Sequence, residues 1–318
     1  MRVLVVGAGA IGSVLGGFLA KSGHEVTLLG RAWHLDVIRR QGLSIRGIWG
    51  EHDVRTLSLI TSPDELAGRP PFEWIFVCVK SYDTASVASL LAQWVEPETL
   101  VCAFQNGLGN YETLTQHVAA ERLAVGRVIF GVELEPGRVL VTVCADDLLI
   151  GAPDSRVPES RLHALVNAFR SSGIPARPTE TILVALWAKV LYNCALNGLS
   201  TALEVPYGVL LQHILARRLM ERVVEEAYRI AAAHRIALEP PTPAAYRELL
   251  FTRLIPDTAV HYPSMLQDLR RGRPTEVEAL NGALVRLAHQ VGLEAPINQL
   301  ITRLVHEKER FAGVAPLS

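Results

Sequence analysis

The chain has 318 residues, about twice the ~150 residues of a common domain, so we expect two domains. Hydrophobic residues make up 49% of the sequence and charged residues 20%, which supports a buried core and excludes a disordered chain. The formal net charge of −1 provides no overall basic field for nucleic acid or an anionic membrane surface. The four cysteines lie in apolar stretches without a C-x-x-C pair, so we expect reduced thiols in a cytoplasmic protein and no metal site.

The first half of the chain alternates predicted strands and helices. A short apolar strand at residues 2–6 is followed by a glycine-rich turn, a helix over 13–22 and a second strand at 25–29. Further strands are predicted at 74–79, 100–104, 123–130, 139–143, 147–150 and 174–177, and further helices at 32–41, 82–94, 110–118 and 159–171. This order predicts an α/β fold whose N-terminal domain, residues 1–178, is a doubly wound Rossmann-type sheet.

From about residue 179 onward the pattern is helical. Helices are predicted at 180–203, 207–234, 244–250, 264–271, 274–291 and 297–309. Residues 179–318 are therefore predicted to form an all-helical C-terminal domain. The apolar stretch 182–203 is long enough to span a bilayer, but Lys189, Asn193 and Asn197 near its middle would be costly in lipid, so we predict a buried helix.

A glycine motif, Gly7-x-Gly9-x-x-Gly12, lies between the first predicted strand and helix. Gly7 permits a tight turn, Gly9 lets the backbone approach a pyrophosphate, and Gly12 lets the helix pack closely on the sheet. A plain glycine-rich turn is the alternative, but this strand-to-helix context favours a dinucleotide site at the positive end of the helix. The predicted cofactor-binding residues of this turn are Gly7, Ala8, Gly9, Ala10, Ile11 and Gly12.

The end of the second strand bears on which nicotinamide cofactor is used. NAD sites usually place Asp or Glu there to bind the ribose 2′-hydroxyl, whereas this chain has Gly30-Arg31. Arg31 can pair with a 2′-phosphate and stack on adenine, and Lys80 can add a second positive charge. Each could be an ordinary exposed base, but together they favour NADPH over NADH.

Three polar side chains interrupt the apolar helix at 180–203. Lys189, Asn193 and Asn197 are spaced i, i+4 and i+8, which places them in one stripe along the helix. A lysine that reaches the surface beside two incidental asparagines is the alternative. Because burying an unpaired ammonium is costly, we predict that the stripe faces a polar cavity.

Two further polar residues lie close to predicted helix starts. Pro274 suits the first turn of the helix predicted at 274–291, and Glu276 would follow within that turn. Glu276 is then either a carboxylate that stabilises the helix dipole or a functional acid, and periodicity does not choose between them. Ser264 is similarly an N-cap or a binding residue.

Taken together, these motifs resemble the ketopantoate reductases (2-dehydropantoate 2-reductases) over nearly the whole chain. The shared segments are Gly7-x-Gly9-x-x-Gly12, Arg31, Val79-Lys80, Gln105-Asn106-Gly107-Leu-Gly109, Leu186-Trp-x-Lys189-x-x-x-Asn193-x-x-x-Asn197, Ser264-Met-Leu-Gln-Asp268, Thr275-Glu276 and Asn281-Gly282. The glycine motif is common to many enzymes, whereas the Lys/Asn/Asn helix joined to the two C-terminal segments is specific.

The resemblance implies a role for each matching residue. Lys189 would be the catalytic acid and Glu276 its partner. Asn106 would lie beside the nicotinamide and the catalytic lysine. The residues implied to bind substrate are Asn106, Asn193, Asn197 and Ser264, and those implied to contact the cofactor's 2′-phosphate are Arg31 and Lys80.

The implied activity is NADPH-dependent reduction of 2-dehydropantoate to pantoate by hydride transfer to the C2 carbonyl, as in pantothenate biosynthesis. The chain departs from the family at His261-Tyr262-Pro263, before Ser264, where a polar residue such as Asn is frequent. A reductase of a different 2-oxo acid on the same scaffold is therefore an alternative, and a non-catalytic NADPH-binding sensor is a weaker one. The expected partner is a small-molecule 2-oxo acid, with no nucleic acid, membrane or metal, and exposed helices such as 207–234 could mediate a homodimer.

Overall fold

The computed structural model describes residues 1–314, which divide into two compact units. Unit 1 contains residues 1–105 and 110–182, and unit 2 contains residues 106–109 together with those from 183 onward. The sequence predicted a single boundary near residue 178, and it did not predict that residues 106–109 would belong to the second unit. The short segment 106–109 belongs with unit 2 because the Leu108 N–H donates a hydrogen bond to the Ala279 carbonyl oxygen at 2.9 Å.

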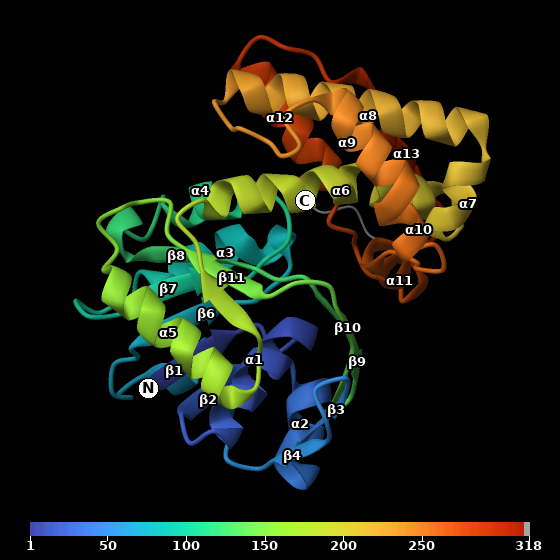
Figure 1. Ribbon diagram of the computed structural model, residues 1–318. Coiled ribbons are helices and arrows are strands. Elements are labelled where there is room, and N and C mark those ends of the chain that lie inside the picture. Colours follow the sequence, from blue (N-terminus) through green and yellow to red (C-terminus); the bar gives the residue numbers. More distant parts are fainter. Residues whose placement is uncertain (315–318) are drawn as a thin grey trace. The chain divides into compact units, whose positions relative to one another are not determined.

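Unit 1 is built on an eight-stranded sheet within the described residues, in the order β12-β11-β8-β7-β6-β1-β2-β5. Figure 1 labels its strands β11, β8, β7, β6, β1 and β2. Its strands are β1 (Arg2–Val6), β2 (Glu25–Leu29), β5 (Ser58–Ile60), β6 (Trp74–Val77), β7 (Leu100–Ala103), β8 (Leu123–Arg127), β11 (Leu148–Gly151) and β12 (Ala176–Pro178). All neighbours are parallel except β8 and β11. Because β1 lies between β2 and β6, the strand order reverses where the glycine motif begins, the usual place of a ligand in such sheets. The predicted Rossmann-type fold is confirmed.

Helices cover both faces of this sheet, as the alternation of side chains along β1 requires. Val3 and Val5 pack with α1 (Ala10–Lys21) and α5 (Glu159–Ser172), whereas Leu4 and Val6 pack with α3 (Thr84–Leu91) and α4 (Asn110–Leu114). The remaining helical elements of unit 1 are α2 (Ala32–Gln41) and the turns η1 (Pro63–Leu66), η2 (Ser81–Asp83) and η3 (Ala120–Arg122).

A second sheet in unit 1 was not predicted from the sequence. Among the described residues it has four strands in the order β4-β3-β10-β9, namely β3 (Leu43–Gly47), β4 (His52–Val54), β9 (Phe130–Glu135) and β10 (Arg138–Cys144). The stretch predicted as one strand at 123–130 thus ends in one sheet and continues into another. A Cβ on Gly16 would press on Leu28 of the main sheet, and one on Gly17 would press on Ile45 of the second. The two glycines therefore let α1 pack closely between both sheets.

Buried His34 links three elements of unit 1. Its Nε2 is 3.0 Å from the Ser13 hydroxyl of α1, and its Nδ1 accepts the Gly137 N–H at 3.1 Å from the turn before β10. Because Nδ1 accepts, the ring proton lies on Nε2 and the imidazole is neutral. Burial lowers the pKa of His34 from its ordinary value of 6.5.

We expect His34→Gln to flatten the loss of stability on acidification. A histidine whose pKa is lowered on folding contributes full stability above its unfolded pKa and loses it as the pH falls toward its folded pKa. The loss is at most about 1.4 kcal/mol per pH unit. Glutamine can donate to Ser13 and accept from Gly137 without titrating. Urea unfolding between about pH 7.5 and about pH 5.5 measures the difference, and equal slopes for the two proteins would contradict it.

Unit 2 is helical, as predicted. Its elements are α6 (Ile182–Leu203), α7 (Tyr207–Gln212), α8 (Ile214–Ala233), α9 (Pro243–Leu249), the π-helical turn η4 (Leu250–Leu254), α10 (Ile255–Asp257), α11 (Ser264–Arg270), the turn η5 (Val277–Ala279), α12 (Asn281–Gln290) and α13 (Pro296–Phe311). By length and composition α6 could cross a membrane, but most of its apolar window is buried in the protein. Its side chains contribute to the core of unit 2 with those of α8.

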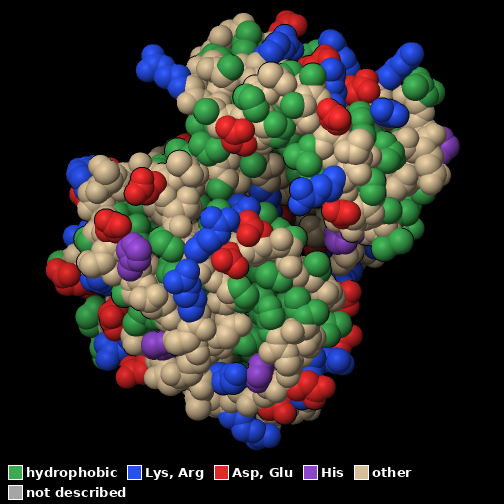
Figure 2. Space-filling view, in the orientation of Figure 1, with side chains coloured by type: hydrophobic (Ala, Val, Ile, Leu, Met, Phe, Trp, Pro, Cys, Tyr) green, Lys and Arg blue, Asp and Glu red, His purple; other side chains and the backbone are tan. Residues whose placement is uncertain are grey.

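Two predicted helices of unit 2 are interrupted. The stretch 207–234 forms α7 and α8 with a break at His213, whose extended backbone caps the second helix. The stretch 274–291 is helical only from Asn281 onward, apart from the single turn η5. On the face shown in Figure 2, basic and acidic side chains are interspersed, consistent with the near-zero net charge.

Candidate active site

The turn after β1 adopts a conformation that requires glycine at two positions. Gly7 has φ +102°, and a Cβ there would lie 2.7 Å from the Val79 backbone nitrogen. A Cβ on Gly12 would collide with the Gly7 carbonyl oxygen. The protein's own backbone thus dictates the first and third glycines of the motif.

Gly9 differs, because a Cβ there would meet nothing within 4 Å. It is the N-cap of α1, and the Ser13 N–H donates to its carbonyl at 2.9 Å as the first hydrogen bond of the helix. The amides of Ala10, Ile11 and Gly12 precede that bond at the positive end of the helix. The open space at Gly9, beside these amides, can accommodate the diphosphate of a dinucleotide.

The two predicted 2′-phosphate contacts follow the strands that flank β1. Arg31 is the exposed N-cap of α2 after β2, and Lys80 is the half-buried N-cap of η2 after β6. A Cβ on Gly30 would lie 2.6 Å from the Ala8 Cβ, so an acidic side chain does not fit there. Burial raises the pKa of the Asp83 carboxyl at the end of η2, and the Arg31 charge acts in the opposite direction. The residues that directly follow β2, Gly30 and Arg31, are therefore not acidic, and the Asp83 carboxyl is near enough to interact with Arg31.

In unit 2 the polar stripe on α6 meets different partners along its length. Lys189 is half-buried, and its Nζ donates a 2.5 Å hydrogen bond to the Asn106 Oδ1. Asn193 is half-buried one turn later. Asn197 is buried, and its Oδ1 accepts a 2.6 Å hydrogen bond from the Tyr207 hydroxyl. Burial raises the pKa of Tyr207 well above its usual value, which keeps this phenol a donor.

The expectation that Glu276 lies in the first turn of a helix over 274–291 is wrong. The Ala279 carbonyl, which in a continuous helix would accept from residue 283, accepts the Leu108 N–H instead. Leu280 then takes a non-helical conformation, with φ −108° and ψ −101°, and α12 begins after it. Glu276 is a buried residue before the turn η5, so the helix-dipole role does not apply to it.

The same contact positions Asn106. Gly107 has φ +87° and packs directly on Ala279, where a Cβ would collide with the carbonyl oxygen. Segment 106–109 is thereby docked on the segment that carries Glu276, and Asn106 reaches Lys189 from it. The structure thus brings three of the predicted site residues into one connected region of unit 2.

Ser264 is the exposed first residue of α11, and Pro263 is the N-cap, so the N-cap reading of Ser264 is wrong by one position. Ser264 is preceded by His261, Tyr262 and Pro263, where the sequence indicated a departure from the family pattern. The His261 ring lies against the Tyr207 ring with centroids 5.3 Å apart, and Tyr207 holds Asn197. His261 therefore contacts Tyr207, which in turn holds a side chain predicted to bind substrate.

Sequence reasoning missed the residues that hold this region in place. Glu309 accepts the Thr275 N–H at 2.7 Å, and Tyr207 holds Asn197. The i, i+3 spacing of His306 and Glu309 on a helix could have indicated a pair. No local pattern could have indicated a backbone partner 34 residues away.

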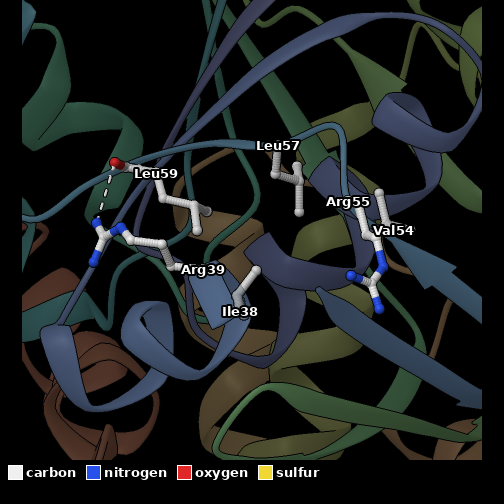
Figure 3. Close-up of a pocket in the computed structure, with 6 residues that line it drawn as sticks. All are labelled: Ile38, Arg39, Val54, Arg55, Leu57 and Leu59. Atoms are coloured by element: carbon white, nitrogen blue, oxygen red, sulfur yellow. Dashed lines mark hydrogen bonds between the residues drawn. The ribbon is translucent and has the colours of Figure 1, made fainter. Parts of the chain in front are cut away.

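A hollow elsewhere in unit 1 lies outside the predicted site (Figure 3). It has a volume of about 170 Å³ and is lined by Ile38, Arg39, Val54, Arg55, Leu57 and Leu59. Arg39 donates to the Leu59 carbonyl oxygen at its edge. None of its lining residues was predicted to bind cofactor or substrate.

Both units match models of one protein family. Residues 3–155 match "Ketopantoate reductase PanE/ApbA", and residues 181–309 match "Ketopantoate reductase PanE/ApbA C terminal". A 2-dehydropantoate 2-reductase of Aquifex aeolicus is 36% identical over 312 residues, covering 98% of this chain and 98% of that protein. One from Pyrococcus abyssi is 32% identical over 98% of this chain and 99% of that protein.

Solved structures are similar over the full length. The PanE/ApbA family ketopantoate reductase of Ralstonia eutropha JMP134 has a TM-score of 0.87 and 31% identity, covering 98% of this chain and 100% of that chain. A D-mandelate dehydrogenase complex with NADH and anilino(oxo)acetate has a TM-score of 0.85 and 28% identity, covering 99% and 100%. The two family matches together with the full-length relatives show that this chain belongs to the ketopantoate reductase family.

Proposed function

We propose that this protein is an oxidoreductase that reduces 2-dehydropantoate to pantoate with NADPH. The observation that carries the proposal is the ammonium of Lys189, held by the Asn106 side chain beside the segment of Glu276. The relatives named 2-dehydropantoate 2-reductase align with the segments that supply all three residues. Unit 1 supplies the glycine turn for the cofactor.

When bound, the nicotinamide cofactor supplies the hydride that reduces the C2 carbonyl. Lys189 stabilises the negative charge that develops on the carbonyl oxygen and donates a proton to it from Nζ. Asn106 accepts one N–H of the ammonium, which fixes the direction of the others. Glu276 orients Lys189 and accepts a hydrogen bond from a substrate hydroxyl. Asn193, Asn197 and Ser264 hold the rest of the substrate so that the reacting atoms meet at a productive distance.

The substrate is tested by comparing kcat/KM for a panel of 2-oxo acids, followed by the loss of NADPH absorbance. We expect 2-dehydropantoate to exceed pyruvate, 2-oxoisovalerate, oxaloacetate and 2-oxo-2-phenylacetate. A different 2-oxo acid is the second candidate, favoured by the His261 ring against Tyr207 and by the similarity to a D-mandelate dehydrogenase. A higher kcat/KM for another acid would establish that candidate, and NADPH binding without turnover would indicate a sensor.

We expect Arg31→Ala to raise the KM for NADPH about 10- to 100-fold and leave the KM for NADH nearly unchanged. A charge-assisted hydrogen bond to the 2′-phosphate is worth about 1.5–3 kcal/mol, and NADH lacks that phosphate. Lys80→Ala should act in the same direction.

Arg39→Ala is the matched control, because it removes an exposed arginine of α2 that pairs with Asp36. We expect Arg39→Ala to leave the KM for NADPH and the KM for NADH unchanged. An equal rise in the KM for NADPH and the KM for NADH in the Arg31→Ala variant would refute the 2′-phosphate contact.

A further inference from the structure

His306 of α13 lies between two carboxylates. Its Nδ1 is 2.7 Å from Oε2 of Glu309, and its Nε2 is 3.0 Å from Oε1 of Glu278. Ionised carboxylates only accept hydrogen bonds, and a neutral imidazole has a single N–H. Both contacts can be hydrogen bonds only when the ring is an imidazolium. We call Glu278, His306 and Glu309 the His306 clamp.

The clamp holds the backbone on both sides of Glu276. The second oxygen of Glu309, Oε1, accepts the Thr275 N–H at 2.7 Å, and this bond is buried. Glu278 follows Glu276 by two residues and also pairs with Arg286. Protonated His306 therefore ties the residue before Glu276 and the turn after it to the same point on α13.

The charged groups around His306 explain why it holds its proton. Glu278 faces it from the segment 275–280, and Glu309 faces it from its own helix. Arg286 of α12 and Arg303 of α13 line a hollow of unit 2 together with Glu278 and His306. Burial by itself lowers the pKa of His306, but the bonds and charges of Glu278 and Glu309 outweigh it, so the pKa is raised above 6.5. The pKa of Glu278 is lowered although burial opposes the shift, because His306 and Arg286 favour its ionised form.

We propose that His306 is a positioning residue that, as an imidazolium, aims the Glu276 carboxylate through Glu309 and Glu278. The inference rests on the proposed function, in which Glu276 orients Lys189 and the substrate. When His306 loses its proton, one of its two bonds becomes a contact between a ring lone pair and a carboxylate. The segment around Glu276 is then released on that side, and the reduction slows.

The sign of the pH dependence follows from the raised pKa. The clamp is intact below the ordinary histidine pKa and opens as the pH rises through the raised value. The wild-type protein should therefore lose kcat/KM as the pH rises through the raised pKa of His306.

The test compares kcat/KM–pH profiles of the wild type, His306→Gln and His306→Lys. Glutamine is never cationic, so we expect about 3- to 10-fold lower kcat/KM at mildly acidic pH and convergence with wild type at alkaline pH. Lysine stays cationic, so it should restore activity and shift the alkaline loss upward. His163→Gln is the matched control, since His163 also contacts a carboxylate, Glu159, on the solvent-exposed side of α5, and should leave the profile unchanged.

A second readout follows the clamp without substrate. The Thr275 amide proton, observed by NMR, should shift as His306 titrates in the wild type and remain constant in His306→Gln. Absence of wild-type turnover with every 2-oxo acid would overturn the proposed function. Two results would overturn the clamp. One is wild-type turnover whose pH profile is unchanged in His306→Gln, and the other is a wild-type Thr275 amide proton whose chemical shift does not change with pH.

Discussion

Replacement of Lys189 by alanine is expected to lower kcat about 100- to 10,000-fold, the usual contribution of a general acid. In the proposed mechanism, the variant would lack both the charge that stabilises the developing oxyanion and the proton that completes the reduction. Alanine is the best helix former, so α6 should persist. The affinity for NADPH, measured by fluorescence titration, should stay nearly unchanged because the glycine turn belongs to unit 1.

Lys189→Arg separates the two roles proposed for the Lys189 ammonium. Arginine keeps the positive charge and can donate to Asn106, but it does not give up a proton at ordinary pH. We expect a kcat between those of wild type and the alanine variant. Unchanged turnover in Lys189→Ala would remove this residue from the mechanism.

Replacement of Gly107 by alanine is expected to lower the free energy of unfolding by about 2–3 kcal/mol and to reduce kcat as well. The new Cβ combines strain at φ +87° with a collision against the Ala279 carbonyl oxygen. Relief of the collision would separate segment 106–109 from the turn η5, and the Asn106 contact with Lys189 would shift with it.

Gly109→Ala is a close control for this effect. Gly109 also has a positive φ, +92°, but a Cβ there meets nothing within 4 Å. Gly109→Ala should lower the free energy of unfolding by about 1 kcal/mol through backbone strain alone and retain most of the kcat. Urea unfolding and steady-state kcat on both variants make the comparison. Equal effects would show that docking on Ala279 does not matter.

Much of unit 1 could be predicted because its signals are local. The strands at Arg2–Val6 and Glu25–Leu29 and the helix Ala32–Gln41 occur with the predicted bounds. Each is marked by a continuous apolar run or a helical period that ends at a glycine. The second sheet was missed because β3 and β4 are short and partly polar, and because the pairing of β3 with β10 joins residues about a hundred positions apart.

In unit 2 the sequence was sufficient to predict which residues are candidates for the site, but it was not sufficient to predict how they are arranged. The i, i+4, i+8 spacing placed Lys189, Asn193 and Asn197 on one side of α6. It could not show that Tyr207 engages Asn197 or that Asn106 reaches Lys189. Both partners come from other elements of unit 2.

The amino-acid pattern alone thus determined the two-part α/β and helical organisation, the glycine turn, and which side chains are candidates for the chemistry. The folded chain decided that the helix expected from Pro274 begins only at Asn281, and that Glu276 is held between backbone contacts to Glu309 and a loop from residue 108. The reason is the range of the forces involved. Strand and helix periods arise from neighbours a few residues apart. A carbonyl such as that of Ala279, however, can accept a hydrogen bond from its own helix or from a distant loop, and only the packing of that loop decides between the two.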